Sequence, residues 1–155
     1  MKSFMFLVLV MLMVFSMEKK IRSRSKGKRM NAWYLNRPIY LKSAHGDYLS
    51  VDRKYRLSIS DGRDVTWKIV PTKNDKYLVI SSMGNNLCTN SINIPITCSN
   101  QSGSSEWSIS AMGTNTHGLR NKNGKYLTAG KLGIIKSLRT SNNLQDWETW
   151  TVVKP

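Results

Sequence analysis

The segment Asn123–Leu127 (NGKYL) decides the fold, because variants of it occur upstream as His45–Leu49 (HGDYL) and Met83–Leu87 (MGNNL). The glycines of the three segments are 38 and 40 residues apart. Each segment is followed by a tryptophan that lies two residues before Ile or Val, and the tryptophans are 40 and 43 residues apart. Self-similarity at such a period indicates small units that stack around one shared core.

The repeated region has the pattern of short β-strands. Runs such as Ile39–Lys42, Leu57–Ser60 and Tyr77–Ile80 alternate or are rich in β-branched and aromatic residues, and turn clusters such as Ser60–Arg63 separate them. The Asn123-Gly124 pair predicts a two-residue type I′ turn, in which both residues have a positive φ. No window of ten or more residues beyond the N-terminal segment has helical periodicity.

Four strands are expected in each unit: one before the glycine turn, one at the repeated leucine, one after the next turn and one that ends at the tryptophan. Three units give twelve short strands in three pseudo-repeats of about 40 residues, which is the all-β plan of a β-trefoil. The repeated apolar positions are the expected core: Leu49, Leu87, Leu127, Trp67, Trp107 and Trp150. Trp33 and Trp147 lie off the repeat and are expected to be exposed.

Residues 37–153 resemble a fascin-type β-trefoil, through the G-[DNK]-[YN]-L turn and above all through Asp146–Val153 (DWETWTVV). Fascins bundle actin and use several trefoils in one chain, so this resemblance implies actin binding as one function. The chain is also similar in architecture and charge to fibroblast growth factors, whose heparin-binding surface lies in the last third of the fold. The Gln-x-Trp signature of ricin-type lectins is absent, because Val65, Ser105 and Glu148 precede the tryptophans by two positions.

The first thirty residues differ in composition from the repeats. We expect residues 1–17 to be a signal peptide or a hydrophobic anchor, because Phe4–Phe15 is an unbroken apolar run too short for an ordinary membrane span. Residues 18–30 are expected to be a disordered polybasic arm, which is either cleaved near Lys26–Arg29 or retained. The β-trefoil domain is assigned to residues 31–155. Export is the expected location, with a membrane-tethered or cytosolic product as the alternative.

Charge indicates an acidic partner. The chain has 24 Lys and Arg against 9 Asp and Glu, a net charge of +15. No acidic residue lies between Glu106 and Asp146, and the basic residues of that interval are the predicted anion-binding set: Arg120, Lys122, Lys125, Lys131, Lys136 and Arg139. An ordinary solvated basic face is the alternative explanation of the same pattern.

Cys88 and Cys98 flank an expected hairpin turn around Asn93. Positions symmetric about a turn come close enough in adjacent strands for a disulfide. Two buried thiols are the alternative, and two cysteines without a nearby histidine do not predict a metal site. Asn100-Gln101-Ser102 is a candidate N-glycosylation sequon.

No pattern of catalytic residues stands out, and the chain is predicted to be a non-enzyme without a cofactor. His45 and His117 are expected to be surface imidazoles, and no nucleophile elbow accompanies them. Asp146 and Glu148 alternate with Trp147 on an expected strand, and they are interpreted as surface or salt-bridging groups rather than as a catalytic pair.

These observations predict an exported, monomeric β-trefoil that binds sulfated or other acidic glycans of the heparin type. A growth-factor-like role with a cell-surface receptor is compatible with this prediction. The alternative is a fascin-like actin-binding protein in the cytosol or at a membrane. Specific nucleic-acid binding is not predicted, because it would rest on charge alone.

Overall fold

The computed structural model describes residues 33–155, so the predictions for residues 1–17 and 18–30 lie outside the described part. Three consecutive units contribute four strands each. The first unit has β1 (Pro38–Ser43), β2 (Tyr48–Val51), β3 (Leu57–Ser60) and β4 (Trp67–Pro71). The second has β5 (Tyr77–Ser81), β6 (Asn86–Thr89), β7 (Pro95–Cys98) and β8 (Glu106–Ala111). The third has β9 (Thr116–Arg120), β10 (Tyr126–Leu132), β11 (Ile135–Ser141) and β12 (Thr149–Val153).

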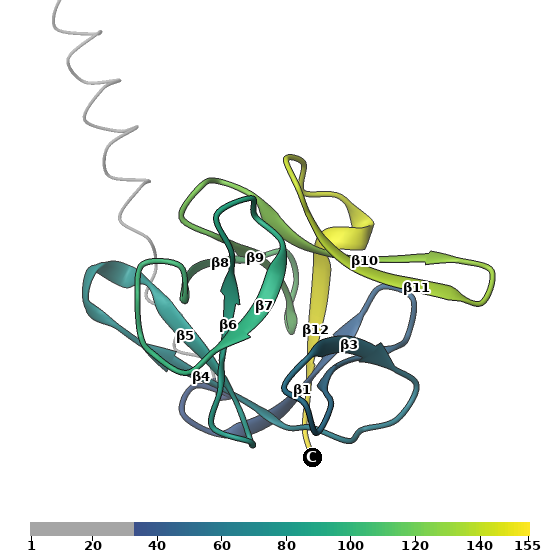
Figure 1. Ribbon diagram of the computed structural model, residues 1–155, viewed down its shortest axis with the longest axis horizontal. Coiled ribbons are helices and arrows are strands. Elements are labelled where there is room, and N and C mark those ends of the chain that lie inside the picture. Colours follow the sequence, from purple (N-terminus) through teal and green to yellow (C-terminus); the bar gives the residue numbers. More distant parts are fainter. Residues whose placement is uncertain (1–32) are drawn as a thin grey trace, which may run out of the picture. The chain divides into compact units, whose positions relative to one another are not determined.

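Six of the strands close into an antiparallel barrel in the order β1, β4, β5, β8, β9 and β12, and β12 pairs with β1 again (Figure 1). Closure leaves the barrel without a free edge. The other six strands form the hairpins β2–β3, β6–β7 and β10–β11. Twelve strands in three equivalent units confirm the β-trefoil predicted from the repeat.

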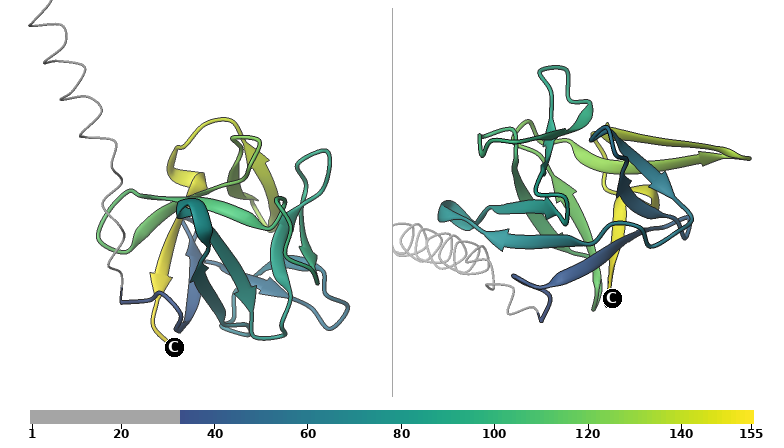
Figure 2. Two further views of the ribbon diagram at one scale, coloured as in Figure 1. Left: turned by 90° about the vertical axis from the view of Figure 1, so that its left-hand side faces the viewer. Right: turned by 60° about the horizontal axis from the view of Figure 1, so that its bottom comes forward.

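Each hairpin joins the barrel at an equivalent place, through the residue pairs Lys42 with Tyr48, Ile80 with Asn86, and Arg120 with Tyr126. The hairpins differ in length, and β10–β11 extends farther from the body of the trefoil than the other two (Figure 1 and Figure 2). The units are therefore alike where they meet the barrel and different at their surfaces.

Three hydrogen bonds of one kind cross the core, one in each unit. A buried indole Nε1–H donates to the backbone carbonyl of the repeated leucine, at 2.9, 2.9 and 3.0 Å; the pairs are Trp67 with Leu49, Trp107 with Leu87, and Trp150 with Leu127. All six side chains are fully buried. The bond satisfies the one polar atom that a buried tryptophan brings into an apolar core.

The glycine turns also repeat, but their geometry differs from the prediction. Gly124 has a φ of +80° and its N–H donates to the carbonyl of Asn121 at 3.1 Å, while Asn121 N–H donates to the carbonyl of Lys125 at 2.8 Å. This is a three-residue loop in which only the glycine adopts a positive φ, so the predicted type I′ turn is wrong. Gly46 and Gly84 adopt the same conformation, with φ of +90° and +88°.

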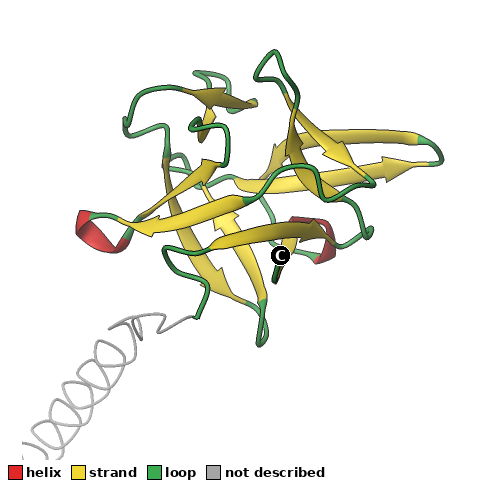
Figure 3. Cartoon of the chain, turned by 90° about the horizontal axis from the view of Figure 1, so that it is seen from below, coloured by secondary structure: helices red, strands yellow, loops and turns green. Residues whose placement is uncertain are grey.

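Helical structure within residues 33–155 is limited to two 3₁₀ turns, η1 (Lys73–Asp75) and η2 (Asp146–Glu148) (Figure 3). Neither is long and apolar enough to cross a lipid bilayer, and no other helix occurs in this range. The tryptophans begin the last strand of each unit, at its first or second residue, instead of ending it. The predicted strand through Trp147 is wrong, since this residue lies in η2.

Cys88 on β6 and Cys98 on β7 form a disulfide, with Cα atoms 6.0 Å apart. The two are not directly opposite, because Cys88 pairs with Ile96 in the ladder and Cys98 pairs with Asn86. They lie on the same face of the hairpin, two positions apart in register. Asn93 occupies the turn between them with a φ of +65°.

Replacement of Trp107 by Phe tests the repeated hydrogen bond. The variant leaves the Leu87 carbonyl without its buried donor and removes part of the indole volume, so the free energy of unfolding should fall by about 2–4 kcal/mol. Urea denaturation measures the change. Trp67→Phe and Trp150→Phe should cost similar amounts, whereas the control Trp33→Phe should cost less than about 1 kcal/mol. Three unequal losses of the core variants would contradict the equivalence of the units.

His117 is buried, which corrects its prediction as a surface residue. Neither of its imidazole nitrogens has a hydrogen-bonding partner among the described residues, and its ring contacts Tyr34 with 5.1 Å between centroids. Burial lowers the pKa of His117 below its ordinary value of 6.5, because desolvation disfavours the charged ring.

Stability should therefore decrease with acidification. The unfolded chain takes up a proton near pH 6.5 that folded His117 accepts only at lower pH, so this contribution is complete above pH 6.5 and is lost as the pH falls through the folded pKa. Urea midpoints at pH 7.5, 6.5 and 5.5 should decline for the wild type. His117→Phe should flatten this decline, and an unchanged slope would assign the dependence to other groups.

Candidate functional site

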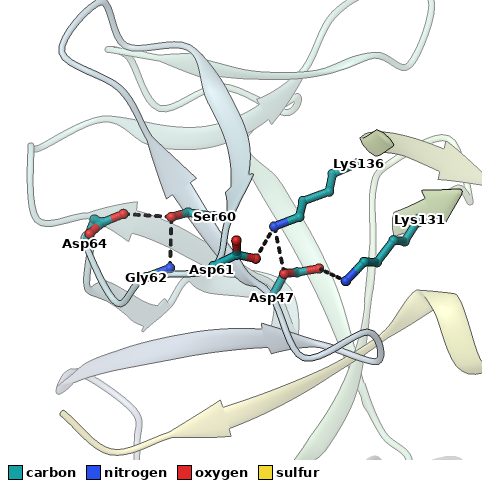
Figure 4. Close-up of polar contacts among 7 residues, drawn as sticks. All are labelled: Asp47, Ser60, Asp61, Gly62, Asp64, Lys131 and Lys136. Carbon is teal, nitrogen blue, oxygen red and sulfur yellow. Dashed lines mark hydrogen bonds and ion pairs between the residues drawn. The ribbon is translucent and has the colours of Figure 1, made fainter. Parts of the chain in front are cut away.

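The six basic residues predicted to bind anions separate into distinct environments. Lys131 and Lys136, near the end of the β10–β11 hairpin, point to acids of the first unit (Figure 4). Lys131 Nζ lies 3.7 Å from Asp47 Oδ2, and Lys136 Nζ lies 3.0 Å from Asp47 Oδ1. Lys136 also pairs with Asp61. We call these four residues the hairpin clamp.

Electrostatic shifts within the hairpin clamp favour the charged forms. The hydrogen bond from Lys136 holds the pKa of Asp61 below its ordinary value, and the same bond raises the pKa of Lys136. Asp47 is only 4% exposed, so its carboxylate depends on these lysines for compensation of its charge. The two lysines thus hold the third hairpin against the first unit.

Arg120 and Lys122 lie elsewhere in the third unit. The guanidinium of Arg120 lies over the ring of Tyr126, 5.7 Å from its centroid. Lys122 is exposed in the β9–β10 turn, with its stem near Gly103. Neither residue lines the hollow that Lys125 and Arg139 share.

Lys125 and Arg139 line one hollow on the surface of the third unit. It holds about 430 Å³, and its remaining lining comes from two turns and β11: Ile92, Asn93, Thr140, Ser141 and Asn142. The Lys125 ammonium donates to Asn142 Oδ1. Thr140 Oγ1 donates to the carbonyl of Asn93 at 2.8 Å, which ties β11 to the neighbouring turn.

Arg139 and Ser141 also line a second hollow of about 340 Å³, which we take with the first as the Arg139 groove. The second hollow adds amide, acid and aromatic side chains: Asn143, Gln145, Asp146, Trp147 and Glu148. Trp147 is 44% exposed, as its position off the repeat predicts, and His45 packs edge-on against it at 5.2 Å. The groove therefore combines two cations, an accessible indole and several hydrogen-bonding groups.

Glu148 belongs to the support of the groove. Its carboxylate is buried and accepts hydrogen bonds from Thr128 Oγ1 and from the backbone N–H of Gln145, both at 2.9 Å. The second bond is half of a capping box that shapes the η2 turn and so positions Trp147. This corrects the prediction of a surface acid, and it leaves Asp146 as the exposed acid of the pair.

The amides of the groove were not identified from the sequence. Asn142, Asn143 and Gln145 belong to a polar turn cluster, and such clusters occur in most loops. Only their position beside Arg139 distinguishes them. Asn100, the candidate glycosylation site, is exposed in the β7–β8 loop. Residues 33–155 contain no group of three His, Cys, Asp or Glu side chains that could hold a metal ion.

Comparisons with known proteins support the fold. No protein-family model matches the sequence, and no curated protein matches it. Among solved structures, SeviL bound to the asialo-GM1 saccharide superposes with a TM-score of 0.64 at 17% identity, over 76% of this chain and 96% of that one. The designed threefold-symmetric protein ThreeFoil gives 0.65 at 16%, over 76% and 99%. Cry35Ab1 gives 0.66 at 21%, over 76% of this chain and 35% of its own length.

Substitution of Asp47 by Asn tests the hairpin clamp. The variant leaves Lys131 and Lys136 with the exposed Asp61 alone and should lower the free energy of unfolding by about 1–3 kcal/mol, less than a fully buried pair because both lysines are partly exposed. Asp61→Asn is the control and should have a much smaller effect. In a thermodynamic cycle with Lys136→Gln, the Asp47 and Lys136 effects should be coupled, and strict additivity would show that the clamp contributes nothing.

Proposed function

We propose that this protein binds an acidic saccharide in the Arg139 groove. The observation that carries the proposal is that the hollow of Lys125 and Arg139 shares Arg139 and Ser141 with the hollow that holds the exposed indole of Trp147. A cationic hollow beside an aromatic hollow matches a sugar that carries a sulfate or carboxylate. The proposal narrows the predicted anion-binding set from six residues to two.

The cations would bind the acidic group. Arg139 presents a planar guanidinium that can donate two parallel hydrogen bonds to a carboxylate or sulfate, and Lys125 adds a point charge. Lys125 already donates to Asn142, so its ammonium is held at the groove wall. The net charge of +15 would speed the approach of an anionic chain and make binding sensitive to salt.

The aromatic hollow would bind the sugar ring. An exposed indole offers an apolar face to the C–H groups of a pyranose, while its neighbours satisfy hydroxyl groups. Asn143 and Gln145 can donate and accept, and Asp146 accepts. These groups would fix the orientation of the ligand, whereas the cations would favour ligands that carry a negative charge.

The structural neighbours support saccharide binding only at the level of the fold. SeviL was solved with a saccharide, on a β-trefoil of similar size. Function resides in sites and not in folds, so this likeness supports a class of ligand and no particular residue. Export of the protein, which is predicted from Phe4–Phe15, is part of the proposal because sulfated glycans occur outside the cell.

Binding of a heparin oligosaccharide and of its desulfated counterpart at 150 mM salt would test the proposal. By calorimetry, Lys125→Gln and Arg139→Gln should each weaken binding of the sulfated ligand about tenfold, the loss expected for one charge-assisted contact. Both variants should also reduce the ratio of the affinity for the sulfated ligand to the affinity for the desulfated ligand. Trp147→Ala should weaken binding of both ligands by similar factors.

Arg53→Gln is the matched control, because it removes one exposed positive charge in the first unit from a residue that lines neither hollow. It should change the affinity less than twofold. If it weakens binding as much as Arg139→Gln, then the protein binds anions only through its net charge. Co-sedimentation with actin filaments that survives Arg139→Gln, in the absence of glycan binding, would favour the fascin-like alternative.

A further inference from the structure

The β10–β11 hairpin breaks the threefold symmetry. In the first two units the repeated leucine pairs with a residue ten positions later, Leu49 with Ile59 and Leu87 with Thr97. In the third unit Leu127 pairs with Thr140, thirteen positions later. These three additional residues account for the longer interval between Trp107 and Trp150.

The additional residues change the form of the turn. The β2–β3 and β6–β7 turns are built alike: Asp52 and Asn90 each accept two backbone N–H bonds with the side-chain oxygen. The third hairpin instead continues its ladder to the pair Leu132 with Ile135. Only Gly133 and Ile134 connect the strands, and Gly133 has a φ of +59°. The result is a narrow projection in place of a compact turn (Figure 2).

The tip of this projection is apolar. Leu132, Ile134 and Ile135 are 80%, 95% and 65% exposed, and the first and last are cross-strand partners on the same face. We call Leu132–Ile135 the apolar tip. Exposure of three adjacent aliphatic side chains to water is unfavourable in free energy, and transfer of these side chains to an apolar phase would be favourable.

The hairpin clamp holds the projection beside its apolar tip. Lys131 and Lys136 immediately flank the apolar tip, and both pair with Asp47 of the first unit. The tip is therefore presented in a defined direction by a ladder of seven residue pairs and a set of ion pairs. A preformed projection loses little conformational freedom when it binds.

We infer that the apolar tip inserts into the interfacial region of a membrane rich in anionic lipid. The tip is convex and ends in a two-residue turn, so it presents far less than the roughly 800 Å² per partner that a stable protein interface buries. It also lacks the aromatic and arginine side chains that dominate such interfaces. A bilayer accepts a small aliphatic wedge without a complementary pocket.

Charge selects the kind of membrane. The chain has a net charge of +15. The lysines that flank the tip are paired with Asp47 and Asp61, so the attraction comes from the net charge of the whole chain and not from the hairpin itself. Each basic residue near an anionic leaflet adds attraction, which combines with the apolar wedge to give two weak signals that act together. The partner is the lipid surface itself, so this interaction is separate from the proposed saccharide site.

Vesicles without carbohydrate provide the test, with the full-length chain. Partitioning onto phosphatidylcholine vesicles that contain 30% phosphatidylserine should fall about tenfold in Ile134→Ser and further in the Leu132→Ser/Ile134→Ser double variant. Ile94→Ser is the matched control, because Ile94 is 48% exposed on another turn and lines neither hollow of the Arg139 groove, and its effect should stay below twofold. Equal partitioning onto pure phosphatidylcholine would overturn the role of anionic lipid.

A local probe separates the apolar tip from the N-terminal segment, which is the same in every variant. An environment-sensitive fluorophore on Ile134→Cys should shift to the blue with anionic vesicles and should be quenched by lipids labelled near the headgroup. The same label on Ile94→Cys should not respond. The absence of a fluorescence change for the label at position 134 would refute insertion. A change of oligomeric state in Ile134→Ser, measured by sedimentation velocity without vesicles, would show that the tip serves self-association instead.

Discussion

The bond from a buried indole N–H to the carbonyl of the repeated leucine is the constraint on which the rest of the structure depends. The tryptophan begins a barrel strand and the leucine lies in a hairpin strand, so the bond joins the two kinds of element in every unit. A donor buried without a partner would cost more than the bond contributes. The hairpins can therefore close over the barrel only in the register that brings each leucine carbonyl to its tryptophan.

The three units are alike in the core and differ at the surface. The third unit alone has the long hairpin, the cations of the Arg139 groove and the η2 turn with Trp147. The first unit supplies the acids that hold this hairpin. Surface features can diverge in this way because they make few contacts with the apolar positions that the three units share.

The architecture followed from the sequence because its signal is repeated: one glycine turn and one tryptophan, each found three times. The surface had no such repetition. Asp61 pairs with Lys136 across 75 positions in the chain, so an interval free of acids was brought against two acids by the fold. Two residues of the predicted anion-binding set, Lys131 and Lys136, are therefore paired with acids in the folded chain.

Other predictions were wrong for local reasons. Asn123-Gly124 favours a type I′ turn, but Asn121 accepts two backbone N–H bonds with its side chain and stabilises a longer loop. Glu148 is buried because Thr128 and the backbone of Gln145 satisfy its carboxylate, and neither partner is recognisable from spacing. His117 is buried without a comparable partner among the described residues, and burial of this kind cannot be read from a single polar residue in a strand.

The pairing of β1 with β12 makes the two ends of the trefoil neighbours in the barrel. Tyr40 lies opposite Val153, so the first and last strands are neighbours and the three units follow one another around a closed barrel. The chain is interrupted only between the third unit and the first. The position of this interruption has no role in closing the barrel. A circular permutant that joins Pro155 to Trp33 and opens the chain at the η1 turn would keep all twelve strands, since surface turns tolerate new termini. The order of the units along the chain is in this sense independent of their order in space.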